Sequence, residues 1–349
     1  MGVFLMRADI VNVFKVASVY VGIILGAGFA SGQEIVKFFV NYGYMGLFGL
    51  LLSGVVFSLV GWAVMDICVK NNIKSYSSFV DLTLGKHFGR AMDILVMIFL
   101  MVLFCTMLAA AGAAMQQVFN FHYTVSVILI AILCFIALLF DVKGFVKINI
   151  LLVPILVVGG IFIGLYSFFN GFSLDFISGE KSIGWVRGAL LYASYNIITA
   201  VTVLCTLNEL GMNKHVAKWG SIFSGVVMTL LGFSLSLALY SNVSAIHTEI
   251  PVLSIVSNYG STIQILYFVI LMVAIFTTAI ANGFALSNYF IDKTRVKSIF
   301  VKAAIVFAGI IFAHIGFSNF VGTVYPIFGY IGFFEIIFII LFALAYRHK

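Results

Sequence analysis

Ten long apolar runs constrain this chain more than any other feature of its sequence. Each run is long enough for a helix to cross a bilayer, which takes about 20 residues. Hydrophobic residues make up 63% of the 349 positions and charged residues only 9%, against about 45–50% and about 25% in ordinary soluble domains. The sequence therefore predicts an all-α membrane protein with a single transmembrane domain over residues 1–349, and it excludes a soluble enzyme. The runs cover residues about 10–41, 45–68, 91–118, 124–141, 146–169, 184–210, 216–241, 262–288, 298–315 and 319–346.

Lysine and arginine are distributed unequally between the loops that these runs define. With the N-terminus inside, all but three of them fall on the inner side, and Lys37, Lys181 and Arg187 fall outside. Because cytoplasmic loops carry an excess of basic residues, we expect both termini to be cytoplasmic, in a multi-pass protein of a bacterial inner or plasma membrane. We interpret the net charge of +7 as a topology signal and expect no nucleic-acid partner. The basic residues on the inner side are Arg7, Lys15, Lys70, Lys74, Lys86, Arg90, Lys143, Lys147, Lys214, Lys218, Lys293, Arg295, Lys297, Lys302, Arg347 and Lys349.

The two halves of the chain have similar organisation. The first and sixth runs each contain a segment that we expect to interrupt the helix, at residues 26–32 and 192–196. After the second run of each half comes a connection of similar length, at residues 70–90 and 242–261. Five runs per half is an odd number, so the second half enters from the opposite side. The pattern predicts a 5+5 inverted repeat, with repeat one over about 10–169 and repeat two over about 184–346, and interrupted helices in both halves point to a transporter's binding site.

Three glycines and two alanines within seven residues distinguish the first interruption, Gly26-Ala27-Gly28-Phe29-Ala30-Ser31-Gly32. Each glycine weakens a helix by about 1 kcal/mol relative to alanine, so we expect the helix to unwind there. Unwound backbone at membrane depth is tolerated where it lines a cavity. Gly26, Ala27, Gly28 and Ser31 are therefore candidate substrate-binding residues. Close helix packing through Gly22, Gly26 and Ala30 is the alternative explanation.

The tetrapeptide Ser31-Gly32-Gln33-Glu34 has the spacing of a helix capping box. A capping box would restart the helix after the interruption, and the positive end of the new half-helix would favour a solute carboxylate. In this interpretation Glu34 is structural. The alternative is that Glu34 carries a proton or binds an amine.

A polar cluster marks the sixth run near its middle, where Tyr192, Ser194, Tyr195 and Asn196 follow one another closely. Polar groups at that depth face a bundle interior or a water-filled cavity, and a tyrosine ring suits an ammonium group. We therefore expect these four residues to bind substrate together with Phe104 of the third run. Hydrogen bonding between helices is the alternative.

Two adjacent hydroxyls, Thr277 and Thr278, lie near the centre of the eighth run. Hard cations prefer oxygen ligands, and carbonyl groups of the unwound first run could complete a sodium site with these hydroxyls. The four cysteines lie within or beside apolar runs with no paired spacing, and the six histidines show no metal-binding spacing. These residues indicate packing and not a zinc site or disulfide framework.

Two short motifs carry a resemblance to a known family: Gly22-x-x-Leu25-Gly26-x-Gly28 and Ala274-x-x-Thr277-Thr278. On these motifs and its ten runs the chain resembles the LeuT-fold transporters of the amino acid–polyamine–cation superfamily. It looks closest to the YkvI-like group of small bacterial amino-acid permeases. The resemblance implies one sodium site, formed by the carbonyls of Gly22, Leu25 and Ala274 and the hydroxyls of the two threonines. Ile23 stands where the neurotransmitter-type branch has an asparagine for a second sodium ion, so the resemblance does not carry that second site over.

These features together predict a secondary active transporter that imports a small amine- or carboxylate-bearing solute by alternating access. An amino acid is the leading candidate for the solute and sodium for the coupling ion, with no enzymatic chemistry, organic cofactor or obligate protein partner. A proton-coupled permease is the alternative within the same class, with Glu34 or Glu335 as the proton carrier. An alternative from another class is a membrane sensor subunit similar to those of spore germinant receptors. A channel is the weakest interpretation, because no run has a polar face along its whole length.

Overall fold

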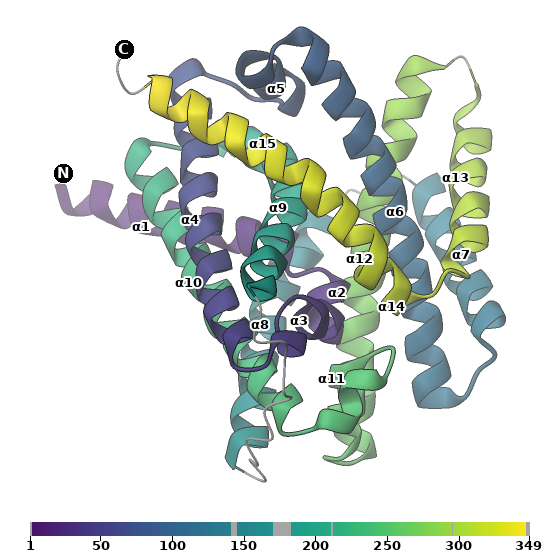
Figure 1. Ribbon diagram of the computed structural model, residues 1–349. Helices are drawn as coiled ribbons and strands as arrows, with labels where there is room; N and C mark the ends of the chain where they lie inside the picture. Colours follow the sequence, from purple (N-terminus) through teal and green to yellow (C-terminus); the bar gives the residue numbers. More distant parts are fainter. Residues whose placement is uncertain (1, 141–144, 170–182, 211, 295, 347–349) are drawn as a thin grey trace.

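The computed structural model describes residues 2–140, 145–169, 183–210, 212–294 and 296–346. Within these ranges every regular element is a helix and no strand occurs (Figure 1). Lys143, Lys181, Arg295, Arg347 and Lys349, which contribute to the predicted orientation, lie outside the described residues. The prediction of an all-α membrane protein is confirmed. The number of ten crossings and the inverted repeat stay predictions.

Seven of the described helices are long and apolar enough to cross a membrane. Two shorter apolar helices, α7 (Tyr123–Leu139) and α13 (Ser298–Ala313), lie together at one edge of the molecule (Figure 1). Six of the seven long helices are α4 (Met45–Asn71), α6 (Lys86–Phe119), α8 (Phe145–Phe169), α9 (Gly184–Leu204), α10 (Lys214–Tyr240) and α12 (Ser261–Lys293). The seventh is the chain from α14 (Phe317–Asn319) through the π-helical turn η4 (Phe320–Val324) to α15 (Tyr325–Tyr346).

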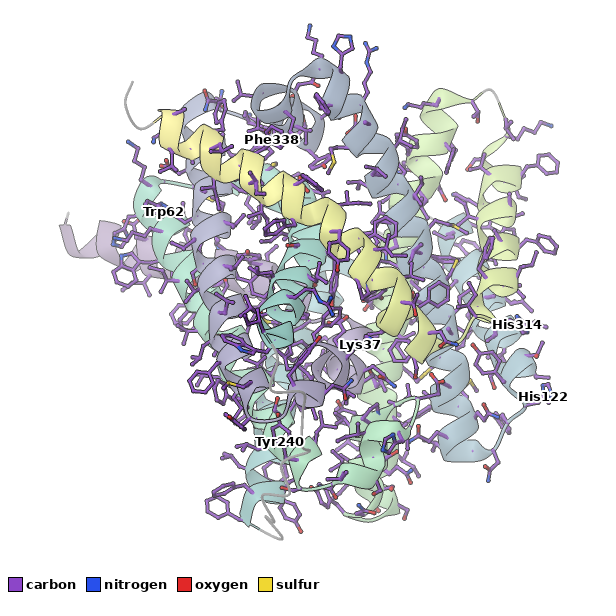
Figure 2. All side chains as sticks on the ribbon, viewed as in Figure 1. Lys37, Trp62, His122, Tyr240, His314 and Phe338 are labelled. Carbon is purple, nitrogen blue, oxygen red and sulfur yellow. The ribbon has the colours of Figure 1, made fainter. Side chains whose placement is uncertain are left out.

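Large apolar side chains point outward around the helices (Figure 2). Val158, Phe307 and Phe334 are each about two-thirds exposed, at 67%, 66% and 65%. Apolar surface of this extent costs about 25 cal/mol per Å² in water, and a soluble protein rarely leaves so much of it uncovered. A lipid bilayer removes that cost, so the outer surface supports the membrane assignment independently of helix length.

The first long apolar run contains three separate α-helices and the beginning of the 3₁₀ helix η1 (Val40–Tyr42). Helix α1 (Gly2–Ile24) ends before Leu25 and Gly26, which are not helical, and α2 (Ala27–Ser31) follows. Gly32 then adopts a left-handed conformation with φ of +88° before α3 (Gln33–Phe38) begins. A residue with a side chain would be strained at that φ. Gly32 therefore sets the change of chain direction between α2 and α3. Helix α2 is a short segment that connects α1 to α3.

The expected interruption of the sixth run at Tyr192–Asn196 is wrong. Helix α9 is continuous through these residues, and the chain tightens into the 3₁₀ helix η2 (Cys205–Leu210) only after α9 ends. The reason is that the polar side chains bond to their own helix. Ser194 Oγ donates to Leu190 O at 2.6 Å, and Asn196 Nδ2 donates to Tyr192 O at 2.9 Å. These groups are satisfied without unwinding, and no glycine occurs between residues 188 and 211 to weaken the helix.

The capping box expected at Ser31–Glu34 does not form. Gly32, and not Ser31, is the N-cap of α3, and Gly32 has no side chain with which to cap the backbone. Ser31 Oγ instead donates to Gly28 O at 2.7 Å and accepts from Gln33 N at 3.2 Å, closing the end of α2. The left-handed Gly32 turns the chain between Ser31 and Glu34, so Glu34 does not form the reciprocal bond of a capping box.

Helix α9 occupies the centre of the fold, between α4 and α15, and α10 packs against α4, α1 and α8 (Figure 1). Helices α6 and α12 form the opposite wall, and α7 and α13 pack outside them. The connection after α4 contains α5 (Tyr76–Leu84), and the connection after α10 contains η3 (Val243–His247) and α11 (Pro251–Ser257). These two connections lie at opposite ends of the molecule (Figure 1).

Candidate functional site

A cavity of about 580 Å³ begins at the break between α1 and α2. Its walls come from α1, α6, α9 and α12, and its deep end is lined by Gly26, Gly28 and Glu34. At the other end Ser75 and Ser77, at the start of α5, line the cavity and are exposed. The cavity therefore reaches the surface at α5, on the side that the basic residues predict to be cytoplasmic.

Glu34 projects from α3 into the deep end of the cavity and is only 4% exposed. Its carboxylate occupies the space that a side chain at residue 28 would need, because a β-carbon added to Gly28 would overlap Glu34 Oε1. The glycine at position 28 therefore makes room for the carboxylate. A β-carbon added to Gly26 would meet nothing within 4 Å, so close packing does not explain the glycine there. Gly22 is different, since a β-carbon there would come within 2.9 Å of Val153 Cγ2.

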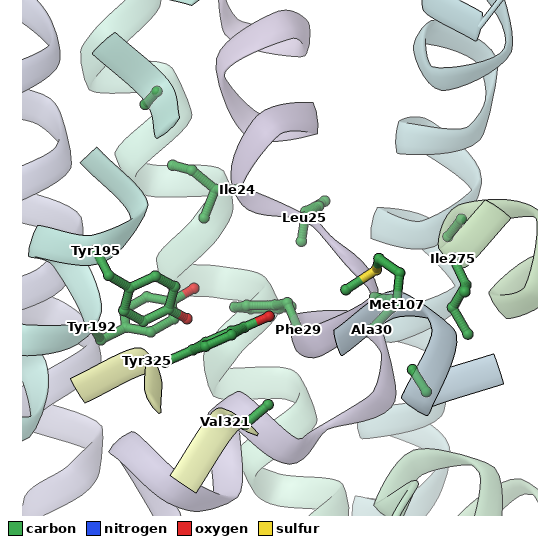
Figure 3. Close-up of a cluster of buried hydrophobic side chains, with 14 of the residues drawn as sticks. Ile24, Leu25, Phe29, Ala30, Met107, Tyr192, Tyr195, Ile275, Val321 and Tyr325 are labelled. Atoms are coloured by element: carbon green, nitrogen blue, oxygen red, sulfur yellow. The ribbon is translucent and has the colours of Figure 1, made fainter. Parts of the chain in front are cut away.

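Three buried tyrosines surround this region. The hydroxyls of Tyr192, Tyr195 and Tyr325 point toward the segment between Ile24 and Phe29 (Figure 3). Tyr195 and Tyr325 line the cavity, and the Tyr195 hydroxyl lies beside the Glu34 carboxylate. Glu34 Oε2 and the hydroxyls of Tyr192 and Tyr195 are buried without a hydrogen-bond partner of good geometry. Unsatisfied buried polar atoms are costly, and their concentration here indicates that a ligand or water completes the site.

Of the other expected substrate-binding residues, some line the cavity and others are buried away from it. Asn196 lines the cavity, but Ser194 is fully buried and packs against α15 at Gly332. Tyr192 is 1% exposed and packs behind the cavity, with its ring centroid 4.9 Å from that of Phe39. Ala27 and Ser31 are buried within α2.

Phe104 of α6 points away from the cavity. It meets the glycines of two neighbouring helices, Gly283 of α12 and Gly309 of α13. The face of α6 toward the cavity instead has the helical spacing of Val96, Phe99, Leu100, Leu103 and Met107. Position 104 lies one residue away from that face.

The structure also adds residues that the sequence did not single out. Phe99, Asn282 and Tyr325 line the cavity, and Asn282 Nδ2 is buried without a partner. Tyr325 comes from the turn where η4 ends and α15 begins. That turn is π-helical, and π-helical turns occur frequently at functional sites. No pattern in the sequence predicts that turn.

Among the five residues expected to bind sodium, Gly22 and Thr278 line the cavity. Thr277 is 2% exposed, and its Oγ1 donates to Val273 O at 2.9 Å and lies 3.1 Å from Ala274 O. Leu25 and Ala274 are buried. The atoms that would coordinate the ion are neutral oxygens, which hard monovalent cations prefer as ligands. In this conformation they are divided between the cavity wall and the helix interior.

A polar cluster, which we call the outer clamp, closes the end of the bundle opposite α5. It comprises Gln33 of α3, Thr248 and Glu249 after η3, and Ser318 of α14. Gln33 Nε2 donates to Thr248 O at 2.8 Å and to Ser318 Oγ at 2.7 Å. The backbone N and the hydroxyl of Ser318 donate to Glu249 Oε2 at 2.9 Å and 2.8 Å. The clamp joins three segments that are far apart in sequence, and none of its four residues lines the cavity.

Glu335, the second expected proton carrier, does not line the cavity. It is fully buried on α15, where Tyr76 of α5 donates a hydrogen bond of 3.3 Å to its Oε1, while its Oε2 has no partner. Tyr76 itself lines the cavity near its mouth. Burial, followed by the nearby charge of Glu335, raises the pKa of Tyr76 above its usual value of 10.0, so its hydroxyl remains a donor at neutral pH. Glu34 and Glu335 are thus separate carboxylates in separate environments.

Comparison with known proteins places the chain in a family. No protein-family profile matches it. The uncharacterized membrane protein YkvI of Bacillus subtilis is 30% identical over 320 residues, which are 91% of this chain and 92% of YkvI.

The similar solved structures are transporters by their descriptions. The inward-facing conformation of Mhp1 superposes with a TM-score of 0.61 at 12% identity, over 92% of this chain and 73% of Mhp1. The Eremococcus coleocola manganese transporter, solved in complex with an aromatic bis-isothiourea substituted compound, also gives 0.61 at 12% identity, over 93% of this chain and 77% of its own. No group of three His, Cys, Asp or Glu side chains that could hold a metal ion occurs within the described residues. The comparisons show that this chain has the LeuT fold and belongs to the family of the membrane protein YkvI.

Proposed function

We propose that this protein is a secondary active transporter that imports a small amine- or carboxylate-bearing solute, with an amino acid as the leading candidate and sodium as the coupling ion. The observation that carries the proposal is the cavity at the break between α1 and α2, where Glu34 and Tyr195 present buried polar atoms without partners. Backbone that leaves the helix at membrane depth and lines a cavity is characteristic of transporter binding sites. Mhp1, with the same fold, is described as a nucleobase-cation-symport-1 family transporter.

The two ends of the cavity support alternating access. The α5 end is open, and the outer clamp closes the other end with hydrogen bonds that water can replace. A transporter needs both ends to open in turn around one site, which exchangeable polar contacts allow. A channel would need a continuous path, and the outer clamp interrupts it.

Sodium coupling rests on the oxygen donors near the break. Gly22 and Thr278 face the cavity, and Thr277 keeps lone pairs available because its hydroxyl is the donor in its bonds to its own helix. The carbonyls of Leu25 and Ala274 would complete the set. A bound sodium ion would supply positive charge and hold α1 close to α12, while the chain's own residues bind the solute.

A thermal-shift experiment with the purified full-length protein tests the coupling ion. Sodium should stabilise the protein by RT ln(1 + [Na⁺]/Kd), which is about 2.7 kcal/mol at 100 times Kd, and potassium should not. The double variant Thr277→Ala with Thr278→Ala should lose this stabilisation. Thr206→Ala should keep it, because Thr206 is exposed and bonds only to Val203 O of its own segment. A sodium shift that persists in the double variant would contradict the assignment of the ion site.

Uptake into proteoliposomes then separates transport from other functions. Candidate solutes come from a thermal-shift screen of amino acids and related amines and acids. Accumulation driven by a sodium gradient supports the proposal. Accumulation that follows a pH gradient and ignores sodium would support a proton-coupled permease, which the buried, cavity-facing Glu34 favours. Solute binding without any accumulation would support a sensor and contradict transport.

A further inference from the structure

The charged side chains that line the cavity are all acidic, and Lys293 contacts the lining from outside, where its Nζ donates to the Tyr289 hydroxyl at 2.6 Å. Within the described residues that line it, Glu34 at the deep end and Asp93 near the mouth are the ionisable carboxylates, and no lysine, arginine or histidine is present. A solute carboxylate would therefore meet no cationic side chain on this lining. A solute ammonium group would meet Glu34, whose Oε2 is buried without a partner. A buried carboxylate is strongly stabilised by a cationic partner and costly without one.

The backbone beside the break is also already next to a carboxyl group, that of Glu34. The sequence suggests that a solute carboxylate would bind at this turn, but Glu34 Oε1 lies where a side chain on Gly28 would be. The protein's own carboxylate thus fills the space next to α2. A solute carboxylate would therefore have to compete with the Glu34 carboxyl group for this space.

The remaining walls at the deep end suit the rest of an organic amine. Tyr195 and Tyr325 present aromatic rings next to Glu34, and Phe99 lies beside both, with ring centroids 6.2 Å from Tyr195 and 6.1 Å from Tyr325. Aromatic faces attract ammonium groups and pack against apolar bodies. Leu103 and Met107 continue this wall as apolar side chains. The volume of about 580 Å³ is within the usual range of small-molecule sites.

From this arrangement we propose that Glu34 binds the ammonium group of the solute, so that the protein selects organic amines and does not require a carboxylate on them. The inference rests on the proposed transport function and narrows its solute class. The aromatic rings of Tyr195 and Tyr325 hold the part of the solute next to the ammonium group. An amino acid would bind at this site through its ammonium group, and its carboxylate would not contribute to recognition.

Three probes that share one hydrocarbon body test this assignment. They are 2-phenylethylamine, phenylalanine and 3-phenylpropionate, which carry the amine alone, both groups, and the carboxylate alone. With the full-length protein in detergent, 2-phenylethylamine and phenylalanine should each raise the melting temperature, and 3-phenylpropionate should not. The same set on an isobutyl body, isoamylamine, leucine and 4-methylpentanoate, should show the same order with smaller shifts.

Matched carboxamide variants identify the carboxylate responsible. Glu34→Gln should weaken 2-phenylethylamine binding at least tenfold, because it removes the charge and keeps the shape. Glu335→Gln removes a second buried carboxylate of the described residues, one that does not line the cavity, and it should leave binding unchanged. If Glu34→Gln does not fold, the melting-temperature shifts that the three probes produce in the wild-type protein still test the inference.

The inference and the transport proposal fail in different ways. Equal shifts from 3-phenylpropionate and 2-phenylethylamine, or no shift from any of the amines, would overturn the inference. Unchanged amine binding in Glu34→Gln would overturn it as well. If proteoliposomes accumulated only solutes that need their carboxylate, transport would stand and the amine assignment would fall. Amine binding with no accumulation of any solute would leave the amine site and contradict transport.

Discussion

The outer clamp predicts how strongly the cavity is closed on the side opposite α5. Gln33 Nε2 makes two hydrogen bonds across it, at 2.8 Å to Thr248 O and 2.7 Å to Ser318 Oγ. A hydrogen bond contributes about 1 kcal/mol net, because water replaces it when it opens. The variant Gln33→Leu removes both bonds and should favour the opened clamp by about 2 kcal/mol. Since about 1.4 kcal/mol is a factor of ten, the population with an open outer end should rise about 30-fold.

Cysteine accessibility measures this population directly. Ala281 lines the cavity, and Ala281→Cys introduces a reactive thiol there, while the four natural cysteines are all buried. A membrane-impermeant thiol reagent applied from outside to right-side-out vesicles should modify this cysteine slowly. In the Gln33→Leu background the reaction should be about 30 times faster, because its rate follows the fraction of open molecules when opening is rapid.

A second glutamine provides the control for this experiment. Gln116 lies on α6 with an exposed side chain, outside the outer clamp, and Gln116→Leu makes the same chemical change. It should leave the labelling rate unchanged. An unchanged rate in Gln33→Leu, or an equal increase in Gln116→Leu, would refute the idea that these two hydrogen bonds hold the outer end closed.

Three further predictions follow from local contacts and charge. Gly28→Ala should weaken solute binding at least tenfold in a thermal-shift titration, because its β-carbon displaces the Glu34 carboxylate. Gly159→Ala, on α8 and outside the cavity lining, has open space and should bind normally. Equal effects of the two changes would refute this. Tyr76→Phe should lower the free energy of unfolding by about 1–3 kcal/mol, because it leaves Glu335 Oε1 without its hydrogen-bond donor. Adding Glu335→Gln to this variant should restore part of the lost stability. An unchanged melting temperature of Tyr76→Phe would contradict this prediction. A reporter fused after Lys349 should be active only in the cytoplasm; activity outside would overturn the orientation inferred from the basic residues.

The sequence predicted the membrane class and the location of the first helix break for physical reasons that act locally. Apolar length decides whether a segment can cross a bilayer, and glycine propensity decides where a helix is weak. The same reasoning failed at Tyr192–Asn196, where polar residues were expected to require an unwound backbone. Ser194 and Asn196 bond to carbonyls of their own helix, and a list of polar residues cannot distinguish that from a broken helix.

The residues that form the site could not be predicted fully, because they come together from positions that are far apart in the sequence. Glu34 lies beside the Tyr195 hydroxyl although 161 positions separate the two residues, and no local pattern pairs them. The capping-box spacing gave Glu34 a structural role, and the left-handed Gly32 removes that role by taking the N-cap position. Tyr325 was missed because its place in the cavity depends on the turn at η4.

The way the two ends of the cavity are built bears on how the protein could cycle. The outer clamp consists of two hydrogen bonds between side chains and two between a side chain and the backbone. A hydrogen bond of this kind contributes about 1 kcal/mol net, because water can replace it. Burying a large apolar side chain instead contributes about 1.5–3 kcal/mol with no polar substitute in water. An apolar plug of four such residues would hold the outer end closed by 6 kcal/mol or more, and the open population would fall below about one molecule in 10⁴. A polar closure keeps the difference between states within a few kcal/mol, so the binding free energy of a solute or ion is large enough to shift it. Polar residues at Gln33, Thr248, Glu249 and Ser318 therefore fit a protein whose outer end opens during function.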